Sequence, residues 1–156
     1  MRIRTQCVIL MGMLLPISVA TSQQDDNLAV TRSAVQFVRQ DLGSARLMVD
    51  AATLRADVAV ADSLARELNA ERNTLANVRE CTTGSVGRRA SCRIRGGGTV
   101  LAFKPAVIHG DTAEITLVWW QEEPATGHVA MQERGLRLVR TKGAWTVQYV
   151  FHKGAS

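Results

Sequence analysis

The chain has few cysteines, prolines and aromatic residues, and it lacks the common catalytic motifs. Only three of its 156 residues are Cys, three are Pro, and 4% are aromatic. The spacing of Cys81 and Cys92 is far longer than the Cys-x-x-Cys of zinc sites and thioredoxin-like centres. The glycines at residues 96–98 precede no Gly-Lys-Ser/Thr, and no serine lies in a Gly-x-Ser-x-Gly elbow. We therefore expect no catalytic residue and no cofactor.

A metal site is also not expected. The three histidines fall at opposite ends of the sheet predicted below, with His109 at one end and His128 and His152 at the other. Zinc needs its ligands within about 2.1 Å of a single ion, and this spread does not favour such a cluster.

Long apolar runs are confined to the first 22 residues. MRIRTQ carries two arginines, CVILMGMLLPISVA is apolar, and small residues follow. This order is typical of a secretory signal peptide at residues 1–22, with cleavage after Ala20 or Ser22. The run is short for a membrane span, and Cys7 precedes it, so no stable membrane anchor is predicted. We expect the protein to be periplasmic or secreted.

The two cysteines that remain after such a cleavage predict a disulfide between Cys81 and Cys92, because exported chains form disulfides. Four arginines lie in or beside this loop: Arg88, Arg89, Arg93 and Arg95. They could bind phosphate, anionic lipid or an acidic partner, or they could belong to a solvated loop. The export signal and the scarcity of aromatic residues argue against nucleic acid.

The rest of the chain predicts one α+β domain at residues 23–156. Helices are expected within residues 25–80, first in DDNLAVTRSAVQFVRQDLG and then from Asp57 to about Arg79, while residues 46–54 fit either a short extended segment or a helix start. The disulfide loop at 81–92 follows. Strands are expected at residues 99–108, 112–121, 128–140 and 144–152.

Side-chain parity predicts one apolar face on this sheet. If the chain folds back at Gly110, Leu101 and Phe103 lie opposite Trp119 and Leu117. The apolar parity changes further on, which predicts a β-bulge near residues 133–135. This face would carry Phe103, Trp119, Met131, Trp145 and Tyr149.

The adjacent Trp120 would point to the other side of the sheet. An exposed tryptophan on this outer face could serve a homodimer or a protein partner, or it could simply be covered by neighbouring side chains.

PAVIHGDTAEITLVWWQ (105–121) and LRLVRTKGAWTVQYV (136–150) resemble the nuclear-transport-factor-two-like superfamily, which includes SnoaL-like and ketosteroid-isomerase-like proteins. The chain also resembles small exported bacterial proteins. The resemblance implies two N-terminal helices packed on a curved, cone-like, four-stranded antiparallel meander, with a pocket for a small apolar ligand. That pocket would be lined by Phe103, Trp119, Met131, Trp145 and Tyr149. The family's enzymes place acids, histidines or tyrosines inside the cone, and here only Tyr149 would bring such a group, with Glu133 beside the bulge.

These features favour an exported binding or interaction domain without a recognisable catalytic site. The alternative is a SnoaL- or isomerase-type enzyme whose catalytic residues the sequence does not identify.

Overall fold

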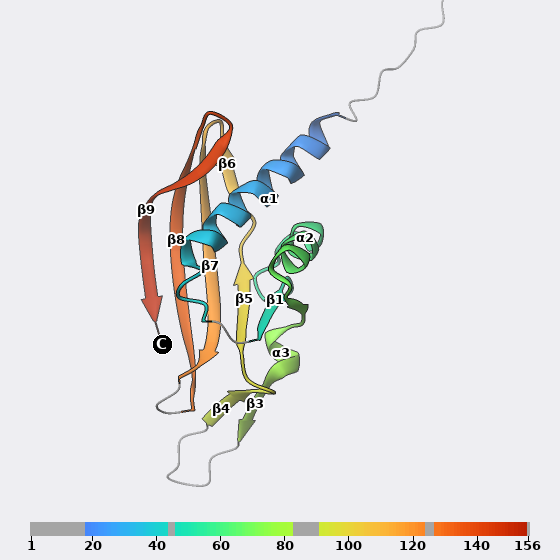
Figure 1. Ribbon diagram of the computed structural model, residues 1–156, viewed down its shortest axis with the longest axis vertical. Coiled ribbons are helices and arrows are strands. Elements are labelled where there is room, and N and C mark those ends of the chain that lie inside the picture. The colour runs from blue at the N-terminus through green and yellow to red at the C-terminus, as the bar shows by residue number, and fades with distance from the viewer. Residues whose placement is uncertain (1–17, 44–45, 83–90, 124–126, 156) are drawn as a thin grey trace, which may run out of the picture.

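The computed structural model describes residues 18–43, 46–82, 91–123 and 127–155. The helices of this part are α1 (Ser18–Val38), α2 (Val58–Leu68) and α3 (Leu75–Val78). Its strands are β1 (Leu47–Asp50), β2 (Glu71–Arg72), β3 (Arg79–Thr82), β4 (Ser91–Ile94), β5 (Thr99–Phe103), β6 (Val107–His109), β7 (Thr112–Glu122), β8 (Val129–Thr141) and β9 (Ala144–Ala155). Figure 1 shows α1 and α2 lying across the large sheet, with the β3–β4 hairpin at its lower end.

The large sheet is mixed and has seven strands, in the order β2-β1-β5-β7-β8-β9, with β6 also paired to β7. Strands β5 to β9 are antiparallel, but β1 runs parallel to both β2 and β5. The predicted fold of two helices on a four-stranded, cone-like antiparallel meander is therefore wrong. One of the two interpretations of residues 46–54, a short extended segment, contains β1, but its parallel pairing and strand β2 were not predicted. Strand β1 has four residues and β2 only two, which is too short for a periodic signal.

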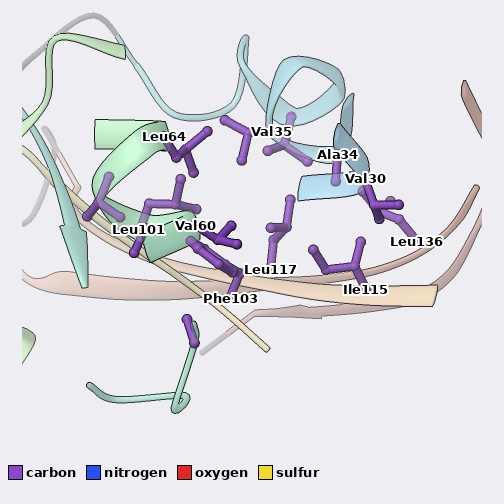
Figure 2. Packing of buried hydrophobic residues seen from close by; sticks show 14 of the residues in the cluster. Val30, Ala34, Val35, Val60, Leu64, Leu101, Phe103, Ile115, Leu117 and Leu136 are labelled. Atoms are coloured by element: carbon purple, nitrogen blue, oxygen red, sulfur yellow. The ribbon is translucent and has the colours of Figure 1, made fainter. Parts of the chain in front are cut away.

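The main core lies between the sheet and helices α1 and α2. Val30, Ala34 and Val35 of α1 and Val60 and Leu64 of α2 point toward the sheet (Figure 2). They meet the buried side chains of Leu101, Phe103, Ile115, Leu117 and Leu136. The apolar residues of each helix recur at helical spacing, so one side of each helix is buried and the other is solvated.

The second predicted helix, from Asp57 to about Arg79, is interrupted. Asp57 caps α2 as expected, but Asn69 adopts a left-handed conformation with φ 51° and ends the helix. The chain then forms β2 and α3. As a result Leu75 and Val78 join a second cluster on the other face of the sheet, with Met48, Ile94 and Val100.

The predicted register is confirmed only for the first strand pair. Leu101 lies opposite Trp119, and Phe103 lies opposite Leu117. Between β7 and β8, however, Trp119 faces Gln132 and Trp120 faces Met131, so Met131 lies on the outer side rather than the helix side. The pairing of β7 with β8 is regular throughout, and the bulge predicted near residues 133–135 does not interrupt it.

The irregularities occur instead in the pairing of β8 with β9. The register shifts between Gly135 and Leu136 and again between Arg137 and Leu138. The extra residues are on β9, so Tyr149 and Phe151 turn to the outer face, where they are 46% and 48% exposed. Val107 is also exposed, because β6 begins one residue out of phase with β5.

The predicted signal peptide falls mostly on residues 1–17, outside the described part of the chain. Helix α1 begins at Ser18 and runs across both predicted cleavage positions. Within the described residues, none of the helices has the length and apolar character needed to cross a membrane.

Candidate ligand cleft

A surface cleft of about 320 Å³ lies where the parallel strands β1 and β2 end. The residues that line it all come from the segment between the end of β1 and α3. They are Ala51 and Ala52 after β1, Val58 at the start of α2, Arg72 at the end of β2, Asn73 and Thr74 just after β2, and Asn77 in α3. Strand β1, helix α2 and strand β2 form a parallel β-α-β unit. The carboxyl ends of parallel strands are where open α/β sheets bind ligands, because loops and helix N-termini converge there.

Asp50 connects two segments that line this cleft, the turn after β1 and the start of α3. Its buried carboxylate accepts hydrogen bonds from the backbone nitrogens of Ala52 (2.7 Å), Thr53 (3.0 Å) and Leu75 (2.7 Å), and from the Thr53 hydroxyl. Burial by itself would raise the pKa of the Asp50 carboxyl. The donors, led by the Leu75 N–H, outweigh that effect and hold the pKa below its ordinary value. Asp50 is therefore ionised and ties the turn after β1 to the start of α3.

The other charged groups around the cleft are also paired. Asp57 accepts hydrogen bonds from the Ala59 and Val60 nitrogens, which satisfies donors at the N-terminus of α2. The Arg72 guanidinium contacts Asp62 at 2.8 Å and donates to the Val49 carbonyl at 3.3 Å. The charged groups around the cleft are thus paired within the protein. The polar groups left for a ligand are mainly uncharged.

Those uncharged groups are amides and a hydroxyl. Thr74 caps α3 by accepting a hydrogen bond from the Asn77 nitrogen, and the Asn73 side chain accepts one from the Thr74 nitrogen. The Asn77 side chain is exposed at the rim. Opposite them lie small apolar side chains, including Val58, which is 61% exposed. The cleft can hydrogen-bond one side of a small molecule and contact an alkyl group on the other.

None of the five residues predicted to line a pocket lies in this cleft. Phe103, Trp119 and Trp145 are buried in the main core, at most 6% exposed. The buried indole nitrogens of Trp119 and Trp145 have no hydrogen-bond partner among the described residues. Their rings lie 5.3 Å and 4.9 Å from the guanidinium carbons of Arg134 and Arg140. Met131 is half-buried beside Trp120.

Tyr149, the fifth, is on the outer face of the sheet. The Arg137 guanidinium carbon lies 6.0 Å from the centre of its ring, and Arg137 also contacts Glu114 at 3.6 Å. Tyr149 is therefore separated from the three core aromatics by the sheet itself, and the five residues do not form one pocket.

The predicted disulfide is present: Cys81 and Cys92 are bonded across the β3–β4 hairpin. Of the four arginines of the predicted anion patch, Arg88 and Arg89 lie outside the described residues. Arg95 pairs with Glu80 at 2.6 Å, whereas Arg93 makes no ion pair among the residues that the structure describes. Of the two arginines of this patch that the structure describes, one is therefore neutralised by an ion pair.

Trp120 points away from α1 and α2, as its strand parity predicts, but it is partly covered. It packs against the second cluster, which Ile94 of β4 and Leu75 and Val78 of α3 complete. Its use by a homodimer or a protein partner stays a prediction.

Within the described residues there is no group of three His, Cys, Asp or Glu side chains that could hold a metal ion. His152 instead lies 3.4 Å from the Glu133 carboxylate.

Comparison of the chain with protein-family models, with curated proteins and with solved structures gives no match. The resemblance to the nuclear-transport-factor-two-like superfamily therefore stays a prediction.

Proposed function

We propose that this chain is a small binding domain that acts outside the cytoplasm and holds an uncharged polar molecule in the cleft at the ends of β1 and β2. The observation that carries the proposal is the pairing of every charged group that builds the cleft, which leaves amides, a hydroxyl and small apolar side chains for a ligand.

A charged ligand would gain little in this cleft. The backbone N–H groups that could hold an anion are occupied by the carboxylates of Asp50 and Asp57, and an added anion would be repelled by both. A cation would have to compete with the Arg72 guanidinium for Asp62. An uncharged molecule avoids both costs, since it needs no counter-charge.

The ligand is small and contains an amide. A volume of about 320 Å³ lies at the lower end of the range for small-molecule sites. The side-chain amide of Asn77 offers a donor and an acceptor, and Asn73 adds its NH₂ group as a donor, because its side-chain oxygen already accepts from the Thr74 nitrogen; together they match the donor and acceptor of another amide. Val58 and Ala52 can contact a methyl or short alkyl group beside it. We therefore choose a blocked amino-acid amide as the test ligand.

Action outside the cytoplasm is supported by the Cys81–Cys92 disulfide, because such bonds form and persist in oxidising compartments. The apolar and small-residue order of the first 22 residues supports the same location.

The test is a titration of the ¹⁵N-labelled protein, followed by backbone amide shifts, with three probes of one skeleton. N-acetyl-L-alaninamide is neutral, N-acetyl-L-alanine is an anion, and L-alaninamide is a cation at pH 7. We expect the neutral probe to shift the amides of residues 51–53, 58–59 and 72–77 with a dissociation constant at least threefold lower than that of either charged probe.

Val58→Glu should abolish these shifts, because a carboxylate would then fill the apolar side of the cleft. A glutamate in the first turn of α2 suits the helix dipole, so the fold should be kept. Ala59→Glu is the matched control, since it adds the same charge one residue later, at an exposed position outside the lining. Tighter binding of the anion, shifts confined to other surfaces, or no shift with any probe would each reject the proposal.

A further inference from the structure

The Cys81–Cys92 disulfide lies at the surface, on a hairpin separate from the large sheet. Strands β3 and β4 form their own two-stranded sheet, in which Cys81 and Cys92 are directly paired. Cys81 is exposed and Cys92 is half-buried. A thiol in solution can therefore approach the Cys81 sulfur more freely than the Cys92 sulfur.

The two sulfurs also differ in their electrostatic surroundings. An N–H of Arg79 donates to the Cys92 sulfur, with the Nη2 and Sγ atoms 3.3 Å apart. A guanidinium at this distance stabilises a negative charge on Cys92 and so favours its thiolate. No such contact is made to Cys81 among the described residues.

A hollow of about 410 Å³ opens beside Cys81. It is lined by Glu80, Cys81, Thr82, Ser91 and Arg93. The Glu80 carboxylate is paired with Arg95, whereas Arg93 has no ion-pair partner in the described part of the chain. The Thr82 and Ser91 hydroxyls, 2.9 Å apart, add polar groups. Among the described residues, the hollow thus places the guanidinium of Arg93, which has no ion-pair partner there, beside Cys81, and this suits an anionic molecule.

We propose that this hairpin is a thiol–disulfide exchange site for a small anionic thiol, with Cys81 as the attacked sulfur and Cys92 as the leaving group. The thiolate of the small molecule forms a bond to the Cys81 sulfur. The Cys81–Cys92 bond breaks, and its electron pair stays on Cys92 as a thiolate beside Arg79. The products are a mixed disulfide at Cys81 and a free thiolate at Cys92.

The reverse step restores the protein, since the Cys92 thiolate attacks the Cys81 sulfur and releases the small thiolate. A second small thiolate can instead attack the mixed disulfide at the sulfur that the first small molecule contributed. This releases the Cys81 thiolate and forms the disulfide of the small molecule, so the protein disulfide is reduced by two electrons and two small thiols are oxidised.

The two arginines have separable roles in this scheme. Exchange is faster when the leaving thiol has a lower pKa, so Arg79 should accelerate the attack of any thiol. Arg93 acts on the incoming molecule, and should matter more when that molecule carries negative charge in addition to its thiolate.

The experiment measures the rate of mixed-disulfide formation by mass spectrometry after acid quenching, at one pH, with reduced glutathione (anionic) and 2-mercaptoethanol (neutral). Arg79→Gln should slow both thiols by about threefold to tenfold. Arg93→Gln should slow glutathione by about twofold to fivefold, and should slow 2-mercaptoethanol less, because its thiolate carries no further negative charge. Arg66→Gln, which removes an equal charge from an exposed position on α2, should alter neither rate.

Peptide mapping of the wild-type reaction supplies a test that needs no variant to fold. Glutathione should be found on Cys81 in at least about nine of ten early products, a preference that follows from accessibility and from the leaving group. Glutathione mainly on Cys92, an Arg79→Gln variant that reacts as fast as the wild type, or an Arg93→Gln variant that slows both thiols equally would overturn the proposal.

Discussion

Replacing Asp50 by alanine should be among the most damaging single changes in this protein. The carboxylate accepts four hydrogen bonds, three of them from backbone N–H groups. Alanine leaves these three donors without an acceptor. An unsatisfied buried donor costs about 1–3 kcal/mol. The Leu75 N–H is fully buried, whereas those of Ala52 and Thr53 lie at a partly exposed turn, so we expect a total loss of about 3–5 kcal/mol.

This loss is a large part of the stability of an ordinary domain, about 5–15 kcal/mol. Asp50→Asn keeps one acceptor oxygen but turns an amide NH₂ toward the remaining donors, so it should lose about 2–3 kcal/mol. Asp57→Ala is the matched control. It also removes a carboxylate that accepts from two backbone nitrogens, but at an exposed helix cap, and should cost only about 1 kcal/mol. The assay is urea unfolding followed by circular dichroism with the disulfide intact.

The pH dependence gives a second measurement of the same interaction. The pKa of Asp50 is lower in the folded protein than in the unfolded chain. Its contribution to the unfolding free energy is therefore complete above the unfolded pKa of about 4 and is lost as the pH falls through the lower, folded pKa. The difference between wild type and Asp50→Asn should narrow on going from pH 7 toward strong acid. A constant difference, or an Asp50→Ala variant no less stable than Asp57→Ala, would refute the reasoning.

Substitutions at three further positions, two of them with a control variant, test other parts of the fold by urea unfolding. Gly98 has φ +107°, and a Cβ on it would lie 2.3 Å from the Arg46 carbonyl oxygen, so Gly98→Ala should cost more than about 2 kcal/mol. Gly143→Ala, with φ +82° and open space around it, should cost about 1 kcal/mol. Arg140 pairs with Asp26 of α1 and with Asp111, and lies over Trp145. Arg140→Ala should lower the urea concentration at the unfolding midpoint, and by less in 1 M salt, while Lys142→Ala should leave the midpoint unchanged. Trp120→Glu should cost about 2–4 kcal/mol, because it places a carboxylate against the second cluster. Full stability with a changed sedimentation coefficient would instead place Trp120 in an interface.

The positions of the strands and turns in the antiparallel half of the sheet could be predicted because that information is local, whereas the register was predicted correctly only between β5 and β7. The strand pattern of residues 112–121 is found in β7, and the turn at Lys142 and Gly143 has the two positive φ values that join neighbouring strands tightly. The outward turn of Tyr149 could not be predicted, because it depends on two extra residues in β9 whose cost is offset only by packing. One such packing contact is the Phe151 ring over Gly135, where a Cβ would lie 2.5 Å from the ring.

The cleft was missed for a different reason. Asp50 follows the apolar residues of a short strand, and nothing local distinguishes it from an exposed aspartate at a turn. Its partner Leu75 is distant in the sequence and belongs to a segment whose apolar spacing continues that of α2. Helix α2 ends at Asn69, so α3 is a separate element. This separation allows the Leu75 N–H to reach the Asp50 carboxylate.

The sequence by itself determined the properties that depend on neighbouring residues: the apolar alternation of the long strands, the tight turns between them, the capped start of α2, and the one cysteine pair that could close the hairpin loop. Tertiary structure alone decided the parallel pairing of β1 with β2 and β5, the face on which Tyr149 lies, and the burial of Asp50. These features depend on contacts between distant segments. Such contacts exist only when burial of the whole core offsets the entropy of bringing the segments together.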